Sequence, residues 1–420
     1  IMRLSNNLMY QNNINKILEN QQNVAGAQER VTTGQKYLST SENPAAISQG
    51  MLYTNKIETN EQLTKNINQL KGRLETEESL LQGMNDTILE AQMLTIRAGN
   101  GSLDKGDLAS VASELKELQK SLLNLMNSQS EGGKYLFSGY QDDIQTYTFN
   151  STNGKYEYQG DQGQHEVTIA KGVEIKSSDN GFNVFERVDA RLDVVSNGGA
   201  PSGGITAGTV YVQNQGEFDR FHKDNYNSDP DPLISPTINT YNVNVIPGAT
   251  PSSPDQYEIL RDGNPLVPPV TGEVTDEPIE FAGMEIQLEG VAPGQLDFTL
   301  EKPSKENVLN TLEDLIISLN DEQLDEAQIN QALSDGLIQL KNASEQIVFT
   351  QAGLGGRMNV VERVTDSNSA LDINNQENRS SLIEIDAAEA ISDLTKHESG
   401  LQASQATFGR LAKLSLFDYL

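Results

Sequence analysis

The sequence predicts a mainly α fold with a β insertion: a long antiparallel helical bundle or coiled coil built from both termini, and a central β-rich outer domain. Apolar residues near both ends recur at alternating steps of four and three, as on one face of a long helix. In the middle of the chain, short β-branched and aromatic runs between Pro and Gly replace this pattern. Only 36% of the 420 residues are hydrophobic, which favours elongated helices with thin cores.

The first helix is expected from Met2 to Val31. Its seam consists of Tyr10, Ile14, Ile17, Gln21, Val24, Gln28 and Val31. Because two of these positions are Gln, the helix would be marginal in water without a partner. Gly34 then interrupts the pattern, and Ser41 or Asn43 could cap a second helix with Pro44 in its first turn. These signals predict a break between two helices.

The second helix is expected from about Pro44 to Ala98, a length of about 75 Å at roughly 1.5 Å per residue. Its seam is Leu63, Ile67, Leu70, Leu74, Glu77, Leu81, Met84, Ile88, Ala91 and Thr95. Residues 99–101, Gly-Asn-Gly, end it. Leucines and a valine between 108 and 125 then mark an antiparallel return helix.

The pattern changes from helix to strand at Gly132. Runs between residues 135 and 170 are expected to form hairpins, separated by Asn153-Gly154 and by residues 161–163. The clearest later strands are expected at residues 241–246, 256–260, 279–281, 284–288 and 296–300. We interpret this part as an outward-facing domain inserted between helices.

Helices are expected again after Pro303, first from Val308 and then over residues 333–361. A softer stretch, residues 367–379, leads to the terminal seam. That seam is Ile383, Ala387, Ala390, Leu394, His397, Leu401, Ser404, Phe408 and Leu411. Because Ala, Ser and His occupy several positions of this seam, the helix has little apolar surface of its own. We therefore expect the two terminal helices to pair with each other and with other copies of the chain.

The predicted domains follow from this plan. Residues 2–45 and 375–420 would form a terminal coiled-coil core. Residues 46–185 and 303–374 would form a long-helix bundle with β-hairpins, and residues 186–302 an inserted β-rich outer domain.

The net charge of −30 argues against nucleic-acid binding, which needs a basic surface, and against anionic membrane surfaces. Absence of Cys excludes disulfides and thiol catalysis. No basic region followed by an apolar segment opens the sequence, and no window approaches a membrane span. If the protein is exported, we therefore expect export without a cleaved signal peptide and no membrane insertion.

Candidate sites for catalysis or metals are weak. His165, His222 and His397 are not at metal-ligand spacing. Residues 229–231, Asp-Pro-Asp, lack the glycine and glutamate of a calcium loop. Residues 353–356, Gly-Leu-Gly-Gly, lack the Lys and Ser or Thr of a phosphate loop, and we interpret them as a flexible point in a helix. We expect no enzyme activity, cofactor or metal.

Several short motifs together resemble a known family. They are residues 2–5 (MRLS), 31–34 (VTTG), 39–46 (STSENPAA), 132–139 (GGKYLFSG), 156–161 (YEYQGD), 279–290 and 414–420 (LSLFDYL). The first three resemble flagellin-like axial proteins. The others are more similar to the flagellar hook-associated proteins of the hook–filament junction, although Phe417 replaces an expected aliphatic residue.

The resemblance implies a structural subunit of the extracellular bacterial flagellum. The subunit would be exported unfolded by the type III apparatus and would then form a homo-oligomeric adaptor ring beside a neighbouring hook-associated protein and flagellin. The self-assembly candidates are Tyr10, Ile14, Ile17, Val24, Val31, Ile383, Ala387, Ala390, Leu394, Leu401, Phe408 and Leu411.

The resemblance also implies an export chaperone that covers the C-terminal helix. Candidate contacts are Leu394, Leu401, Phe408, Leu411, Leu414 and Phe417. Two alternatives stay open: a flagellin that forms the filament itself, and a surface adhesin or sugar-binding protein that acts through residues 186–302.

Overall fold

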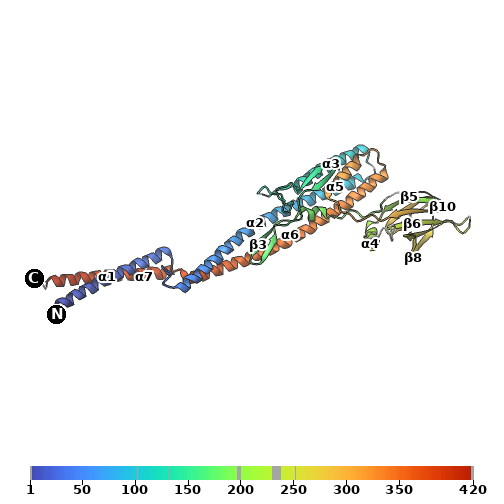
Figure 1. Ribbon diagram of the computed structural model, residues 1–420. Coiled ribbons are helices and arrows are strands. Elements are labelled where there is room, and N and C mark those ends of the chain that lie inside the picture. Colours follow the sequence, from blue (N-terminus) through green and yellow to red (C-terminus); the bar gives the residue numbers. More distant parts are fainter. Residues whose placement is uncertain are drawn as a thin grey trace. The chain divides into compact units, whose positions relative to one another are not determined.

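The computed structural model describes residues 2–101, 103–130, 132–195, 200–228, 238–250 and 252–417, with side chains between residues 8 and 410 of these ranges. The chain divides into two compact units. Unit 1 contains Ile1–Thr76, His165–Ser177 and Gly353–Leu420, and unit 2 contains Glu77–Gln164 and Ser178–Ala352. The predicted fold class, helices at both ends and strands in the middle, is confirmed (Figure 1). The domain boundaries at residues 45, 185, 302 and 374 stay predictions.

Unit 1 is mainly helical. It contains α1 (Met2–Thr33), part of α2 (Pro44–Ala98), part of α6 (Glu326–Ile383) and α7 (Ala387–Phe417), together with the hairpin β3 (Glu166–Ala170) and β4 (Val173–Lys176). The predicted break between the first two helices is confirmed. Gly34 has a φ of 69°, and the Asn43 Oδ1 accepts a hydrogen bond of 3.1 Å from the Ala46 backbone N–H, which caps α2.

The core of unit 1 lies between α2, α6 and the hairpin. Leu70 and Leu74 are buried on α2, as the predicted seam requires. Asn368 of α6 holds the hairpin, because its Nδ2 donates to the Ile169 backbone carbonyl at 3.0 Å. The Asn368 carbonyl in turn accepts a hydrogen bond of 2.8 Å from Asn60 of α2. This chain of hydrogen bonds joins all three segments.

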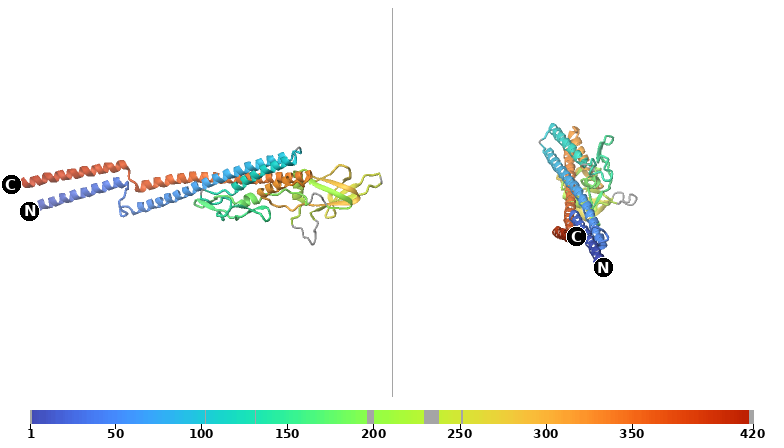
Figure 2. Two further views of the ribbon diagram at one scale, coloured as in Figure 1. Left: turned by 90° about the horizontal axis from the view of Figure 1, so that it is seen from above. Right: turned by 90° about the vertical axis from the view of Figure 1, so that its left-hand side faces the viewer.

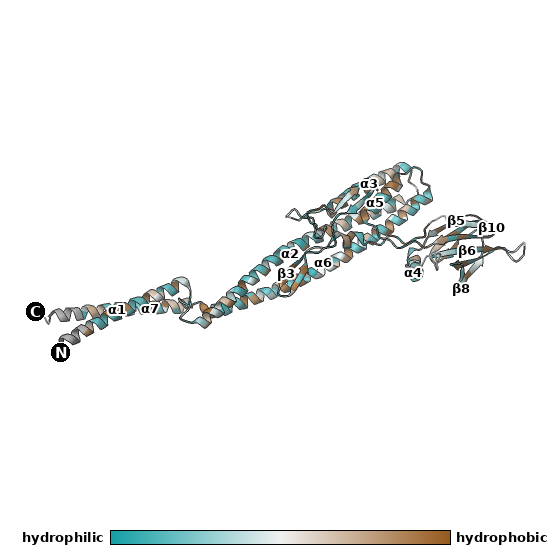
Figure 3. Ribbon diagram, viewed as in Figure 1, coloured by the Kyte–Doolittle hydropathy of each residue, from teal (hydrophilic) through white to brown (hydrophobic). Residues whose placement is uncertain are grey.

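The helices of unit 2 are the remaining parts of α2 and α6 with α3 (Lys105–Met126) and α5 (Val308–Asn320). Apolar and polar residues alternate along these helices (Figure 3). Seam positions Leu81, Met84, Ile88 and Ala91 are fully buried, so the predicted helical period is confirmed here. A capping box between the side chains and backbone N–H groups of residues 104 and 107, both Asp, starts α3.

A second hairpin follows α3, and it consists of β1 (Tyr147–Asn150) and β2 (Lys155–Tyr158). A π-helical turn, η1 (Phe182–Glu186), covers it with Phe185. Residues 135–140 were expected to belong to the hairpins, and this expectation is wrong. They form a bent segment that pairs only at Tyr135, with Gln129, because Gly139 has a φ of 71°.

The inserted sheet is antiparallel, with the strand order β5-β10-β6-β7-β8, and β9 pairs with β10. Its elements are β5 (Ala200–Val212), α4 (Gln215–Asn225), β6 (Thr240–Ile246), β7 (Gln256–Arg261), β8 (Asn264–Glu273), β9 (Ile279–Phe281) and β10 (Met284–Thr299). Two expected strands, 284–288 and 296–300, are parts of the single strand β10. Irregular pairing with β5 around Gly290 and Gly294 keeps that strand continuous.

The core of the inserted domain lies between the sheet and α4. Tyr241 and Val243 of β6 are fully buried, and Phe218 of α4 packs in the same cluster. The outer strand β8 carries prolines at positions 265, 268 and 269. Because proline has no backbone N–H, these residues oppose pairing with another strand at this edge.

Candidate self-assembly interface

Helices α1 and α7 pack against each other in antiparallel orientation, side by side in both views of Figure 2. Tyr10 and Phe408 meet edge to face, with ring centroids 5.1 Å apart. Ten residues after Tyr10, the Asn20 Nδ2 donates a hydrogen bond of 2.7 Å to the Ser404 Oγ. At the other end, the Lys36 N–H donates to the Ile383 carbonyl at 2.8 Å. Residues from the two ends of the chain therefore form one local structure.

The inner face of α1 differs in part from the expected seam. Tyr10, Ile17 and Val24 are partly buried, as expected. Between them, the structure turns Asn13, Asn20 and Ala27 inward in place of residues 14, 21 and 28. Ile14 is 43% exposed and Val31 is 37% exposed. The predicted seam continued from Tyr10, Ile17 and Val24 in steps of four residues, whereas the observed inner residues follow them in steps of three. The two sets lie on opposite sides of the row formed by Tyr10, Ile17 and Val24.

The inner face of α7 follows the expected positions more closely. Ala390 is buried, and Leu394, Leu401 and Phe408 are partly buried. Ile383, at the end of α6, lies against Gly50, whereas Ala387 is exposed. The side chains of Leu411, Leu414 and Phe417 lie outside the described residues.

The paired terminal helices have very little core of their own. Among their described side chains only Ala27 and Ala390 are buried. Large apolar side chains point outward instead: Leu8, Met9, Ile14, Leu18, Val31 and Ile391. Sequence reasoning missed Leu8 and Leu18, although Leu18, four residues after Ile14 and seven before Ala25, was a signal for a second apolar edge. An apolar surface of this kind indicates a docking surface.

The motif at residues 132–139 and the motif at residues 156–161 meet in unit 2. The Asp161 Oδ1 accepts hydrogen bonds of 2.8 Å from the backbone N–H groups of Tyr140 and Gly163. A Cβ atom on Gly139 would lie 2.2 Å from that same oxygen. The Tyr158 hydroxyl lies 2.8 Å from the Asp161 carbonyl, and burial raises the pKa of Tyr158. The two motifs are thus parts of one turn-stabilising cluster.

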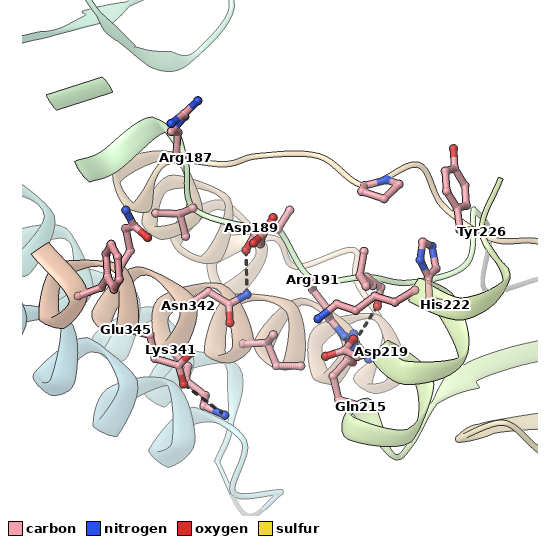
Figure 4. A pocket seen from close by; sticks show the side chains of 18 residues that line it. Arg187, Asp189, Arg191, Gln215, Asp219, His222, Tyr226, Lys341, Asn342 and Glu345 are labelled. Carbon is pink, nitrogen blue, oxygen red and sulfur yellow. Dashed lines mark hydrogen bonds and ion pairs between the residues drawn. The ribbon is translucent and has the colours of Figure 1, made fainter. Parts of the chain in front are cut away.

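A second polar cluster joins the inserted domain to α6, and it lies beside a pocket of about 650 Å³ (Figure 4). Arg191, whose side chain is 3% exposed, forms ion pairs with Asp193 and Asp335. It also donates to Gln215 of α4 at 2.8 Å and to the Val212 carbonyl at 3.1 Å. Burial raises the pKa of both aspartates, and the Arg191 charge opposes this shift.

The Arg191 cluster could not be recognised from a local motif, because its members come from separate segments of the chain. His222, one of the three histidines noted above, lies near it and is buried. Its Nε2 is 2.8 Å from the Glu301 carbonyl, and burial lowers the pKa of His222. His165 lies just before β3 and His397 on the inner face of α7. Asp229 and Asp231 lie outside the described residues, and residues 353–356 continue α6 as helix.

Among the described residues, no group of three acidic or histidine side chains could hold a metal ion. No helix in the described part of the chain has both the length and the apolar character needed to cross a membrane.

Comparison with known proteins supports the resemblance. Residues 4–142 match the bacterial flagellin N-terminal helical region. Flagellar hook-associated protein 3 of Escherichia coli strain K12 is 29% identical over 199 residues, which are 47% of this chain and 62% of that protein. The match thus spans about three fifths of that relative. The expected resemblance to flagellin-like proteins and to hook-associated proteins is confirmed.

Solved structures share the fold. The FlgL protein of Xanthomonas campestris is similar with a TM-score of 0.56 and 22% identity, covering 78% of this chain and 99% of the other. Hook-associated protein 3 of Legionella pneumophila gives a TM-score of 0.57 and 21% identity, covering 79% of this chain and 98% of the other.

Proposed function

We propose that this chain is a structural subunit of the bacterial flagellum and forms the adaptor ring at the hook–filament junction. The names and fold of its relatives support this proposal. The observation that carries it is the α1–α7 pair, which buries two alanines and leaves several large apolar side chains exposed. Such a pair gains stability when neighbouring copies cover it.

In this proposal, α1 and α7 form the inner layer of the assembly. Tyr10, Ile17, Val24, Leu394, Leu401 and Phe408 hold the two helices of one subunit together. Ile14, Val31 and the outward residues Leu8, Leu18 and Ile391 contact neighbouring copies. The same C-terminal residues, Leu394, Leu401 and Phe408, are the surface that an export chaperone would cover before assembly. Hook-associated protein and flagellin would be the neighbours of the ring outside the cell.

A deletion strain tests the proposed function. Bacteria without this chain should secrete filament protein into the medium and keep bare hooks, and the full chain should restore filaments. A variant that lacks residues 380–420 should not restore them. Filament growth in the deletion strain would contradict the junction role.

Removal of the inserted domain separates the junction role from the adhesin alternative. The ends of the insertion lie together, because Asp189 and Lys305 form an antiparallel bridge and the Ala190 N–H donates to the Ser304 carbonyl at 3.1 Å. A short linker in place of residues 191–302 should therefore leave filament attachment largely intact. The adhesin alternative makes a different prediction: loss of residues 191–302 would abolish binding to a surface, and loss of residues 380–420 would not. That pair of results would contradict the junction role.

The flagellin alternative has one observation in its favour, since residues 4–142 match a region named for flagellin. Purified flagellin would be expected to extend into long filaments unaided. Electron microscopy of the concentrated full chain distinguishes the two, and long filaments would contradict the adaptor role.

A further inference from the structure

Unit 2 carries an apolar stripe on α2 that its own core does not use. Leu89, Met93 and Ile96 are 42%, 64% and 61% exposed. Their spacing of four and then three residues places them on one face of the helix. The buried residues Ile88 and Ala91 lie on the opposite side. We call these three residues the α2 stripe.

A second apolar surface of unit 2 lies on α6. Val348 is 50% exposed, Phe349 is 75% exposed, and Ala352 is exposed on the following turn. The core side of this helix carries Ala343 and Ile347. We call Val348, Phe349 and Ala352 the α6 patch.

The two helices pack against each other within unit 2. The Ser344 Oγ lies 2.6 Å from the Asn85 Oδ1, and the Gln351 Nε2 donates to the Gln82 Oε1 at 3.3 Å. The stripe and the patch are therefore on outward faces of two packed helices, and one subunit cannot bring them together. Two different complementary surfaces on one molecule are what a head-to-tail assembly requires.

The charges beside the two surfaces are complementary. Asp86 and Glu90 lie three residues from Leu89 and Met93 on α2, so they border the stripe; Arg97, four residues after Met93, also borders it but is paired with Glu114 at 2.8 Å. Arg187 and Lys341 line the same pocket wall as Phe349, and the Lys341 Nζ lies 3.8 Å from the Glu345 Oε1. Glu345 lines the pocket as well and is the partner of Lys341, so the basic character beside the patch comes mainly from Arg187, which favours an acidic neighbour.

We propose that the α2 stripe of one subunit docks on the α6 patch of the next copy. This inference rests on the proposed function, and it adds the lateral contact between neighbouring subunits. Six side chains are too few for a stable interface alone, since such interfaces bury about 1,200 Å² or more. The contact therefore forms once the terminal helices hold the copies together and raise the effective concentration of one surface at the other.

The contact also sets a stagger between copies. Gln82 lies beside Gln351, close to the α6 patch, whereas Met93 is further along α2 by about 16 Å at roughly 1.5 Å per residue. When neighbouring bundles are parallel, docking the stripe on the patch displaces each copy along the bundle axis by that distance. The series of subunits then follows a helical path.

Cysteine cross-linking tests the contact, and the native chain contains no cysteine that would interfere. The variant with both Met93→Cys and Phe349→Cys is expressed as the sole copy in cells, and isolated flagellar particles are oxidised. We expect a ladder of disulfide-linked multimers, roughly tenfold above the background of Val267→Cys, an exposed control position on β8. The pair Ile96→Cys with Val348→Cys provides a second test should the first variant not fold.

Each other outcome is informative. Particles that contain the double variant without a ladder would overturn the contact and leave the junction role intact. Dimers from Met93→Cys alone would show that two α2 stripes face each other, which also overturns it. Absence of every variant from the particles, the Val267→Cys control included, would overturn the junction role and with it the contact.

Discussion

The ring of Tyr10 in α1 stands at 72° to the ring of Phe408 in α7, although the two residues lie near opposite ends of the chain. The same helix pair also contains the partly buried side chains of Ile17, Val24, Leu394 and Leu401 and the hydrogen bond between Asn20 and Ser404. Aromatic pairs of this geometry contribute about 0.5–1.5 kcal/mol beyond the area that they bury. The pairing of the terminal helices should therefore depend strongly on these two rings.

Replacement of Phe408 by Ala should weaken the α1–α7 pair by about 1–2 kcal/mol, because the ring is only partly buried. Amide hydrogen exchange of residues 8–20 in the free subunit should become correspondingly faster. Gln405→Ala, at an exposed position of the same helix, is the matched control. Equal exchange rates in the two variants would mean that the aromatic contact does not hold α1.

Replacement of Arg191 by Met should destabilise the junction between the inserted domain and α6 by about 3 kcal/mol. The substitution leaves Asp193 and Asp335 near each other without their shared cation, and uncompensated buried charge is costly. Urea denaturation followed by near-ultraviolet circular dichroism measures the loss. Lys305→Met removes an exposed ion pair with Asp189 and should cost less than about 1 kcal/mol.

Stability of the same junction should fall as the pH rises above the ordinary Asp value of 3.8. Burial raises the pKa of Asp193 in the folded chain, so the folded state keeps a proton that the unfolded state has already lost. The stabilisation by this proton is complete at low pH and disappears as the pH passes the raised pKa.

Asp193→Asn should flatten this part of the pH profile of unfolding, whereas the exposed control Asp276→Asn should leave it unchanged. An unchanged pH profile in Asp193→Asn would mean that other carboxyl groups cause the pH dependence. Asp335 and Glu301 are two such groups, because burial also raises their pKa values.

Gly139→Ala should destabilise unit 2 by about 3 kcal/mol or more, through backbone strain and overpacking together. The new Cβ would lie 2.2 Å from the Asp161 Oδ1, at a φ of 71°. Gly154 has nearly the same backbone, with a φ of 70°, but its Cβ would meet nothing within 4 Å. The difference between the two alanine variants in thermal unfolding therefore isolates the contact with Asp161. Equal losses would exclude a steric role for that carboxylate.

Much of the helical architecture could be predicted from the sequence, because the helical period is long and regular. The expected ends of α2, Pro44 and Ala98, coincide with those in the structure. Its seam from Ile67 to Thr95 is buried, including the polar Glu77, whose Oε1 accepts from the Asp179 N–H at 2.9 Å. The softer stretch before Ile383 is nevertheless continuous helix, since contacts such as Asn60 with Asn368 support it.

The assembly surface was harder to predict. A coiled coil repeats every 3.5 residues and a straight helix every 3.6 residues, and the two periods differ little over four turns. The sequence of α1 therefore could not show whether the inner residues follow one another in steps of three then four or of four then three. Asn13 and Asn20 were passed over because they are polar, yet Asn20 bonds Ser404 across the pair. The stripe at Leu89, Met93 and Ile96 was not recognised either, because the buried row beside it already explained α2 as a core helix.

The antiparallel contact between Tyr10 and Phe408 also fixes an order of events in time. Because α1 precedes all the other described helices and strands and α7 follows them, α1 leaves the ribosome long before its partner is made. Until then α1 has no α7 to cover it, whereas the hairpin of β1 and β2 can close as soon as both strands are present. The pair of α1 and α7 can therefore form only after α7 has been made, later than the hairpin.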